Sequence, residues 1–313
     1  MSGPRPCIRL DFCDFYPGFL KTANFFYNLL QERFDVAICD QPDFLIYSHG
    51  GDHHKLHTCT KIYFTVESFL PNWNECDYAF TCHPLETPRH CRLPLYVLYG
   101  RPESICKDGL DLEKILAAKT RFCSFVVSNP NLKKTRHRIE FFRKLSQRKQ
   151  VDSVGKVLNN VGHVLPGWSE AKIEFLKAYK FNLCFENKSL RGYTTEKIFE
   201  PMQAFCLPIY WGNPDINLEF NPRSFLNYFD FPSEEALIER ILELDGDDAK
   251  YLEYLRQPYF PNNTPNEYFS RARLLDKFER IFTTPITPVA RRRGWFQVGR
   301  WTLARRNRLH KHA

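Results

Sequence analysis

The segment from residue 181 to residue 214, FNLCFENKSLRGYTTEKIFEPMQAFCLPIYWGNP, constrains the fold more than any other part of the chain. Its first five residues alternate with a period of two, which is typical of a strand. Residues 186–192 are polar and end in glycine, which indicates a loop. Thr194 or Thr195 can then cap a helix, and Leu207–Trp211 forms a second strand. The segment therefore predicts a strand–helix–strand unit of a parallel α/β sheet.

The start of this helix is a candidate ligand site. Ligands of open parallel sheets bind beyond the carboxyl ends of the strands, and a helix N-terminus offers free N–H groups that suit a phosphate. Lys197 lies in the first turn, and Asn187 and Tyr193 can hydrogen-bond or stack on a ligand. Glu196 is an acceptor suited to hydroxyl or amino groups. The residues alone also allow an ordinary βα unit with a solvated loop.

Three groups of residues follow one another in this segment: CFEN, then YTTEKIFEP after five residues, then PIYWGNP after six. This order resembles the donor-binding motif of the α1,3/4-fucosyltransferases, glycosyltransferase family 10. The resemblance implies two Rossmann-like α/β domains that face a cleft, which is the GT-B arrangement, and it implies GDP-fucose as the donor. It assigns donor-binding roles to Glu186, Asn187, Tyr193, Glu196 and Lys197.

A second part of the resemblance concerns a basic helix. FVVSNPN is followed, after a short gap, by the pattern Arg-x-Glu-Phe-Phe, in which Arg138 corresponds to the arginine that contacts the donor diphosphate. Arg136 is the alternative, because the gap leaves the register open. An arginine suits a phosphate since its planar fork donates two hydrogen bonds at once. For the basic helix itself, a solvated face is the alternative interpretation. Lys156, in a turn-rich stretch, is a further donor-side candidate.

Lys61–Glu67 reads as a strand that ends on a carboxylate. Burial at such a position can raise a carboxyl pKa toward that of a useful base, although a surface glutamate is the alternative. By the resemblance, Glu67 falls where the catalytic base of the family lies. The implied reaction is an inverting single displacement, with Glu67 taking a proton from the acceptor hydroxyl while Arg138 and Lys197 stabilise the charge on the leaving GDP.

The acceptor is not identified by the sequence. O3 of GlcNAc is the first expectation, with O4 or glucose as alternatives, on lactosamine ends or bacterial surface glycans. We expect no cofactor and no divalent metal, because the donor segment contains no Asp-x-Asp clamp. Four histidines between His49 and His57 raise the question of zinc, but their spacing matches no known metal motif, which favours a solvated loop.

The length of 313 residues suits two domains. We expect an acceptor-binding domain over residues 1–118, a GDP-fucose-binding domain over 119–280 and a basic, aromatic tail over 281–313. The tail contains eight Arg or Lys residues and no acidic residue, so its charge is +8. The whole chain also has a net charge of +8, and residues 1–280 are therefore neutral overall.

Basic residues mixed with Trp295, Phe296 and Trp301 suit an anionic membrane surface. Nucleic acid would attract the same charges, but the neutral body argues against it, and a disordered tail is a third possibility.

No apolar run approaches the ~18–20 residues that cross a bilayer, so the expected location is cytoplasmic, at the inner membrane face, unless a secreted protein has been trimmed. The alternative function is a non-catalytic protein that binds a nucleotide sugar or nucleic acid.

Overall fold

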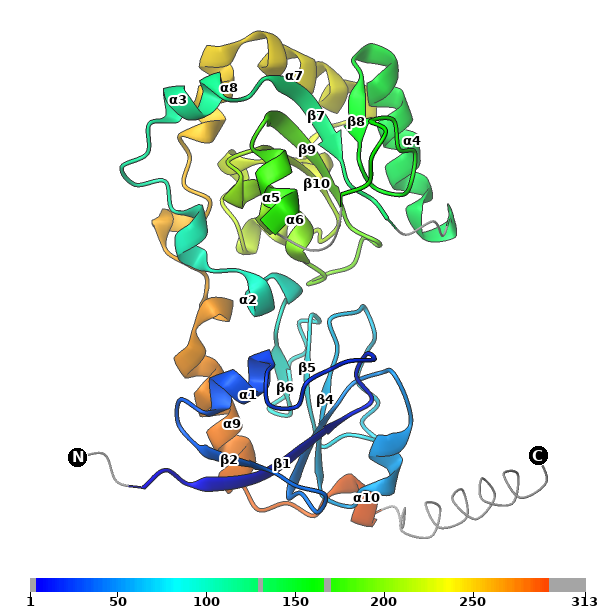
Figure 1. Cartoon of the computed structure of the whole chain (residues 1–313), viewed down its shortest axis with the longest axis vertical. Helices are drawn as coiled ribbons and strands as arrows, with labels where there is room; N and C mark the ends of the chain where they lie inside the picture. The colour runs from blue at the N-terminus through cyan, green and yellow to red at the C-terminus, as the bar shows by residue number, and fades with distance from the viewer. Residues whose placement is uncertain (1–3, 129–131, 166–169, 293–313) are drawn as a thin grey trace, which may run out of the picture. The chain divides into compact units, whose positions relative to one another are not determined.

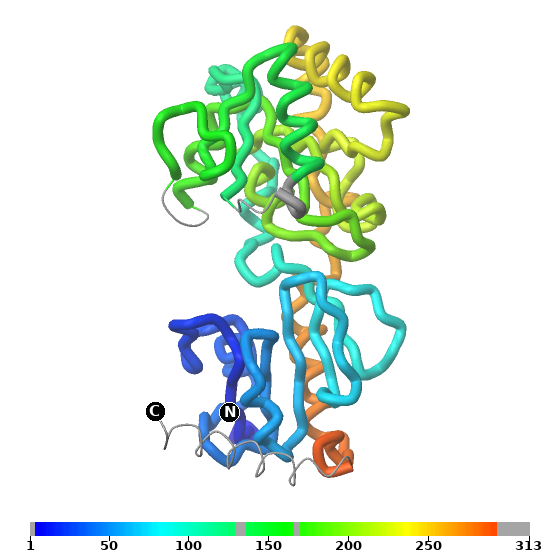
Figure 2. Tube along the Cα trace, turned by 90° about the vertical axis from the view of Figure 1, so that its right-hand side faces the viewer, coloured from blue at the N-terminus to red at the C-terminus, as the bar shows by residue number. Residues whose placement is uncertain are grey.

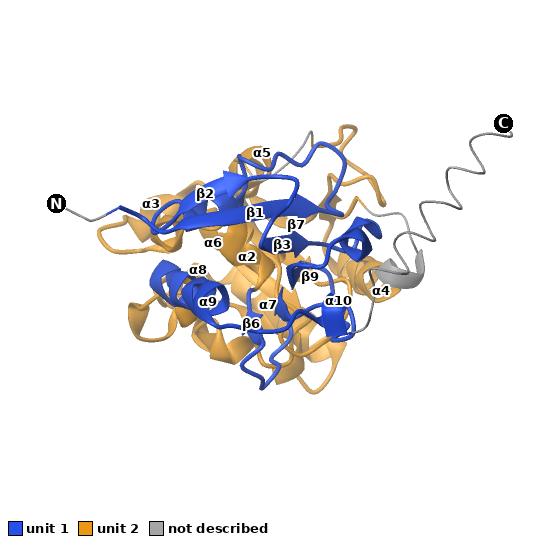
Figure 3. Ribbon diagram, turned by 90° about the horizontal axis from the view of Figure 1, so that it is seen from below, with its two compact units in different colours: residues 1–93, 270–313 blue, residues 94–269 orange. Residues whose placement is uncertain are grey.

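The computed structural model describes residues 4–128, 132–165 and 170–292, which belong to two compact units (Figure 3). Unit 1 consists of residues 1–93 and 270–313, and unit 2 consists of residues 94–269. The boundaries expected at residues 118 and 280 differ from this division. Figure 2 shows the reason: the chain leaves unit 1, builds unit 2, and then returns to unit 1.

Unit 1 is built on a sheet of six parallel strands in the order β2-β1-β3-β4-β5-β6 (Figure 1). The strands are β1 (Cys7–Cys13), β2 (Asp35–Ile38), β3 (Phe44–Tyr47), β4 (Thr60–Phe64), β5 (Tyr78–Thr81) and β6 (His90–Arg92). The helices are α1 (Phe25–Leu30), the 3-10 helix η1 (His53–Leu56), α9 (Arg271–Thr283) and α10 (Val289–Arg292).

Helix α9 completes the core of unit 1. Its Phe278 stacks on Phe80 of β5 with the ring centroids 4.7 Å apart, and it meets the ring of Phe26 edge to face at 5.9 Å. Farther along, the backbone N–H of Val289 donates to the carboxylate of Asp77 at 2.8 Å. Residues 281–292 are therefore part of unit 1 rather than of a separate tail, and only residues 293–313 of the expected tail lie outside the described residues.

Unit 2 contains a second parallel sheet, in the order β11-β10-β9-β7-β8. Its strands are β7 (Arg121–Phe125), β8 (Val151–Ser153), β9 (Tyr179–Phe185), β10 (Leu207–Trp211) and β11 (Leu226–Asn227). Its α-helices are α2 (Leu95–Tyr99), α3 (Leu112–Ala117), α4 (Leu132–Arg148), α5 (Glu170–Leu176), α6 (Glu196–Gln203), α7 (Glu234–Gly246) and α8 (Asp248–Leu255). Short 3-10 helices are η2 (Pro102–Ile105), η3 (Ile216–Leu218), η4 (Pro222–Ser224), η5 (Tyr228–Asp230), η6 (Pro261–Asn263) and η7 (Glu267–Phe269). The predicted α/β class with parallel sheets is confirmed in both units.

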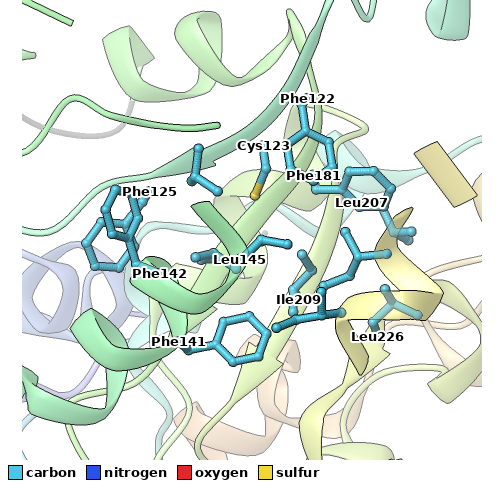
Figure 4. Packing of buried hydrophobic residues seen from close by; sticks show 14 of the residues in the cluster. Phe122, Cys123, Phe125, Phe141, Phe142, Leu145, Phe181, Leu207, Ile209 and Leu226 are labelled. Atoms are coloured by element: carbon cyan, nitrogen blue, oxygen red, sulfur yellow. The ribbon is translucent and has the colours of Figure 1, made fainter. Parts of the chain in front are cut away.

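Aromatic and aliphatic side chains fill the core of unit 2, between α4 and the sheet (Figure 4). On α4, Phe141, Phe142 and Leu145 are buried against the sheet. Burial of large apolar side chains is the main favourable contribution to folding, so these residues fix which face of α4 points inward. This orientation decides which arginine of the helix is buried.

The strand–helix–strand unit of residues 181–214 forms as predicted. β9 lies between β10 and β7, and Phe185 at its end is paired in register with Trp211. The helix begins at Glu196 because the hydroxyl of Thr195 caps it by accepting from the N–H of Lys197. It continues through Pro201 to Gln203. The start of α6 therefore lies next to the carboxyl end of β9, where the ligand site was predicted.

Candidate active site

Glu186 follows β9 directly and has no exposed surface. One of its carboxylate oxygens accepts from the N–H of Thr195 at 2.8 Å and from the hydroxyl of the same residue at 2.9 Å. Glu186 thereby fastens the start of α6 to the end of β9. These contacts are internal, so the predicted direct contact with a donor is not open to Glu186 in this arrangement, and we assign it a supporting position.

Gly212 makes room for this carboxylate. A Cβ atom at position 212 would lie 2.4 Å from Cγ of Glu186 and 2.8 Å from the hydroxyl oxygen of Tyr210. Both distances are far below van der Waals contact, so the site requires glycine here.

Lys197 provides the cation of the site. Its ammonium nitrogen lies 3.3 Å from Glu186 Oε2, 3.3 Å from Glu196 Oε1 and 3.0 Å from Thr195 Oγ1. Burial alone would lower the pKa of Lys197, but the charges of Glu186 and Glu196 outweigh it and raise the pKa above its ordinary value. The lysine therefore stays protonated across the physiological range of pH.

The two glutamates beside Lys197 differ. Burial raises the pKa of Glu186 above its ordinary value. Burial acts in the same direction on Glu196, but the charges of Lys197 and Lys172 outweigh it and lower the pKa of Glu196. Glu196 therefore stays ionised at neutral pH, and its carboxylate can accept hydrogen bonds.

The two arginines of α4 differ in burial. Arg138 is only 3% exposed, and burial lowers its pKa, although the nearby carboxylate of Glu186 acts in the opposite direction. Arg136 is exposed and pairs with Glu140 one turn away, at 2.8 Å. Arg138 therefore lies near Glu186 and Tyr193, and Arg136 belongs to the solvated face of the helix.

The remaining donor-side candidates lie differently. Tyr193 is buried, and its hydroxyl oxygen lies 3.5 Å from the amide nitrogen of Asn187. Lys156 is exposed on the loop that follows β8, whereas Tyr193 is buried and Glu196 and Lys197 are half-buried. The structure thus brings together the side chains of Arg138, Glu186, Tyr193, Glu196 and Lys197, which we call the donor cluster.

Glu67 belongs to unit 1, where it follows β4 and is half-buried. Its N–H donates to the hydroxyl of Thr65 at 3.1 Å, and the same hydroxyl lies 3.0 Å from Nδ1 of His49. Thr65 is fully buried, and its hydroxyl links the backbone of Glu67 to the end of β4. The strand expected over Lys61–Glu67 ends at Phe64, so Glu67 lies three residues beyond β4 rather than at its last position.

The histidine-rich loop surrounds a buried aspartate. The carboxylate of Asp14 lies 2.7 Å from Nδ1 of His54 and 3.1 Å from Nδ1 of His53. Burial alone would raise the pKa of Asp14, but hydrogen bonds from His54 and His53 outweigh it and lower the pKa. His54 is buried, whereas His49 and His53 are exposed, so the solvated loop expected here holds except at His54. Within the described ranges, no group of three or more His, Cys, Asp or Glu side chains could hold a metal ion.

A second buried carboxylate, Glu219, contacts Thr194 next to the donor cluster. It lies in a loop beyond β10 and in none of the motifs, so the sequence pattern gave no indication of it. Only its burial and its hydrogen bonds reveal it.

Two α/β units, each built on a parallel sheet, form a fold of the GT-B type. Residues 116–265 match the family described as glycosyltransferase family 10 (fucosyltransferase), C-terminal part, and residues 10–99 match the N-terminal domain of alpha-(1,3)-fucosyltransferase FucT. The chain belongs to glycosyltransferase family 10.

Individual relatives agree with this assignment. The chain is 30% identical over 297 residues to alpha-(1,3)-fucosyltransferase FucT of Helicobacter pylori, covering 82% of this chain and 61% of that protein. It is 34% identical over 165 residues to a 3-galactosyl-N-acetylglucosaminide 4-alpha-L-fucosyltransferase of Bos taurus, covering 52% of this chain and 43% of that protein. A crystal structure of an alpha1,3-fucosyltransferase with GDP-fucose superposes with a TM-score of 0.76 at 27% identity, covering 92% of this chain and 94% of that one. The chain thus spans less than two thirds of the length of these curated relatives.

Proposed function

We propose that this chain transfers L-fucose from GDP-fucose to a hydroxyl group of an acceptor glycan. The observation that carries the proposal is the donor cluster, in which the ammonium of Lys197 and the guanidinium of Arg138 lie at the start of α6. Membership of a fucosyltransferase family and the likeness to a structure with GDP-fucose support the same donor.

The donor cluster suits a nucleoside diphosphate because its two cations can bind the phosphate oxygens. In the proposed reaction, the bond between C1 of fucose and the β-phosphate oxygen breaks, and negative charge grows on the leaving GDP. Lys197 and Arg138 stabilise that charge, since they are already in place before the reaction. Glu196 supplies an ionised acceptor for hydroxyl groups of the donor.

The acceptor step is assigned to Glu67. Its carboxylate takes the proton of the acceptor hydroxyl as that oxygen attacks C1 of fucose from the side opposite GDP, so the configuration at C1 is inverted. The hydrogen bond from its backbone N–H to Thr65 places Glu67 just beyond β4, and a general base must come within hydrogen-bond reach of the proton that it removes. In this scheme no metal ion takes part, since lysine and arginine provide the positive charge.

We propose O3 of GlcNAc as the acceptor atom, with O4 and glucose as alternatives. Phe69, two residues beyond Glu67, is 51% exposed, and its ring centroid lies 5.1 Å from that of His49. This ring offers an apolar face on which a sugar can rest beside the proposed base.

The donor assignment is tested by thermal unfolding of the protein with GDP, GDP-fucose, UDP or a UDP-sugar. A ligand present at about 100 times its Kd adds about 2.7 kcal/mol to the free energy of unfolding. Protection by the guanine nucleotides alone is expected, and equal protection by UDP would overturn the guanine assignment.

The catalytic assignment is tested by Glu67→Gln, with a turnover assay on a panel of acceptors and GDP calorimetry. Turnover is expected to fall by roughly 10²–10⁴, the usual share of general base catalysis, with GDP affinity unchanged. A wild-type protein that binds GDP-fucose but releases no GDP with any acceptor would favour the non-catalytic alternative.

We further propose that the basic, aromatic residues 293–313 bind an anionic membrane surface from the cytoplasmic side. Each basic residue near such a surface contributes about 1 kcal/mol to binding. Within the described ranges, no helix is long and apolar enough to cross a membrane.

A truncation after Arg292 keeps α10 and is expected to lose binding to phosphatidylserine vesicles but to keep activity on small acceptors. Equal binding of both forms to the vesicles, or preferential binding of the full chain to RNA, would contradict the membrane role.

A further inference from the structure

Glu219 is a buried carboxylate that accepts at least three hydrogen bonds. It lies beyond η3 and is 1% exposed. Its Oε1 accepts from the hydroxyl of Thr194 at 2.9 Å and from the side-chain amide of Asn213 at 2.7 Å, and its Oε2 accepts from the hydroxyl of Tyr96 at 2.9 Å. A buried charge is tolerated only when such donors surround it.

One side of this network holds the segment that leads into α6. Thr194 lies between Tyr193, a member of the donor cluster, and Thr195, which caps α6 and binds Glu186. Asn213 also accepts from the N–H of Gly192 at 2.8 Å. Gly192 and Thr194 are therefore held by groups that lie outside the donor cluster.

The other side of the network lies where the chain enters and leaves unit 2. Tyr96 is on α2, close to the boundary after Leu93, and its ring stacks near Phe199 of α6 at 6.0 Å. The amide of Asn266, close to the boundary after Phe269, donates to the hydroxyl of Tyr96 at 3.0 Å and to the carbonyl of Glu219 at 3.1 Å. Glu219 thus joins the donor segment to both ends of unit 2.

We propose that Glu219 is a positioning residue for the donor site, acting through Thr194 and together with Tyr96. It does not touch the donor. Its hydrogen bonds fix the path of residues 192–195, and that path determines where Tyr193 and the first turn of α6 present their groups to the diphosphate. The inference rests on the proposed function, since it takes a nucleoside diphosphate as the ligand of the donor cluster. Buried polar networks of this kind select one conformation when all members are paired.

The test compares Tyr96→Phe with Tyr251→Phe in the full chain. Tyr251 is also fully buried in unit 2. Its hydroxyl donates to the carbonyl of Lys180, near the start of β9, at 2.6 Å, and it lies outside the hydrogen-bond network of Glu219. Both variants lose one buried hydroxyl, so both should lower the Tm. Only Tyr96→Phe should weaken GDP binding in calorimetry and raise the KM for GDP-fucose, by about three- to tenfold, with a smaller change in kcat.

Glu219→Gln extends the test, because it keeps the shape but replaces one acceptor oxygen by a donor. It should weaken GDP binding more than Tyr96→Phe does, and if it fails to fold, the tyrosine pair still decides. The proposal is overturned if Tyr96→Phe binds GDP as tightly as the wild type, or if Tyr251→Phe weakens GDP equally. If the wild type binds GDP but does not transfer fucose, the proposed function is refuted. The positioning role is then still tested, because it is measured by GDP binding.

Discussion

The ammonium group of Lys197 lies 3.3 Å from a carboxylate oxygen of Glu186, a residue with no exposed surface. The pair is part of the connection between β9 and α6, because Glu186 also binds the capping residue Thr195. The cation of the proposed donor site is thus held by the same contacts that join the strand to the helix. Ligand binding and local stability should therefore be linked at this position.

Lys197→Ala tests this link. The variant leaves the carboxylate of Glu186 buried without its cation, which typically costs about 3–5 kcal/mol of stability. It should also weaken GDP binding by tenfold or more, since a charged hydrogen bond contributes about 1.5–3 kcal/mol. Combining it with Glu186→Gln should restore much of the stability but not the GDP affinity. Denaturant unfolding and calorimetry would show this, and recovery of both properties in the double variant would argue against Lys197 as a phosphate ligand.

Gly212→Ala should destabilise unit 2, because the added methyl group would overlap the side chain of Glu186. Overpacking of this kind typically costs about 1–3 kcal/mol. The matched control is Gly246→Ala at the end of α7, where an added Cβ meets no atom within 4 Å and should be neutral or slightly stabilising. Thermal unfolding of both variants is the measurement, and equal Tm values would show that Glu186 moves aside easily.

Arg138→Ala should weaken GDP binding by tenfold or more and lower turnover, because it removes a cation of the donor cluster. Arg136→Ala should leave both properties unchanged, since Arg136 is exposed and pairs only with Glu140 on its own helix face. GDP calorimetry on the two variants decides between them. A loss of affinity in Arg136→Ala with none in Arg138→Ala would restore the alternative register of the sequence motif.

His90 should make unit 1 sensitive to acid. Its Nε2 lies 2.9 Å from the hydroxyl oxygen of Thr81, and burial lowers the pKa of His90 from 6.5 to about 4. Between these two values the unfolded chain binds the proton more readily than the folded chain, so stability falls as pH drops from about 6.5 toward 4. Between pH 7 and pH 5 the wild type should lose about 1–2 kcal/mol more than His90→Gln. Parallel slopes of unfolding free energy against pH would show that His90 does not contribute.

The prediction from sequence succeeded where local pattern determines structure. β10 has the bounds that its apolar run predicts, and Thr195 caps α6, because strand alternation and helix capping depend on neighbours in the chain. The choice between Arg136 and Arg138 could not be made this way. It depends on how Phe141 and Phe142 seat α4 against the sheet, which is a tertiary contact.

Two further features were beyond the reach of sequence patterns. Glu186 was recognised by its motif, but its burial under Thr195 follows from the close approach that Gly212 permits. The division into two compact units differs from the expected domains near residue 280 because α9 returns to unit 1 through contacts such as that of Phe278 with Phe80, far apart in sequence.

The return of α9 also determines the order in which the protein can fold on the ribosome. Residues 1–93 emerge first, but the rings of Phe26 and Phe80 meet Phe278 only after all of residues 94–269 have been synthesised. Unit 2 is continuous and can fold as soon as it emerges, whereas the first six strands must wait with part of their apolar surface uncovered. We therefore expect a nascent chain of this protein to complete its second unit before its first.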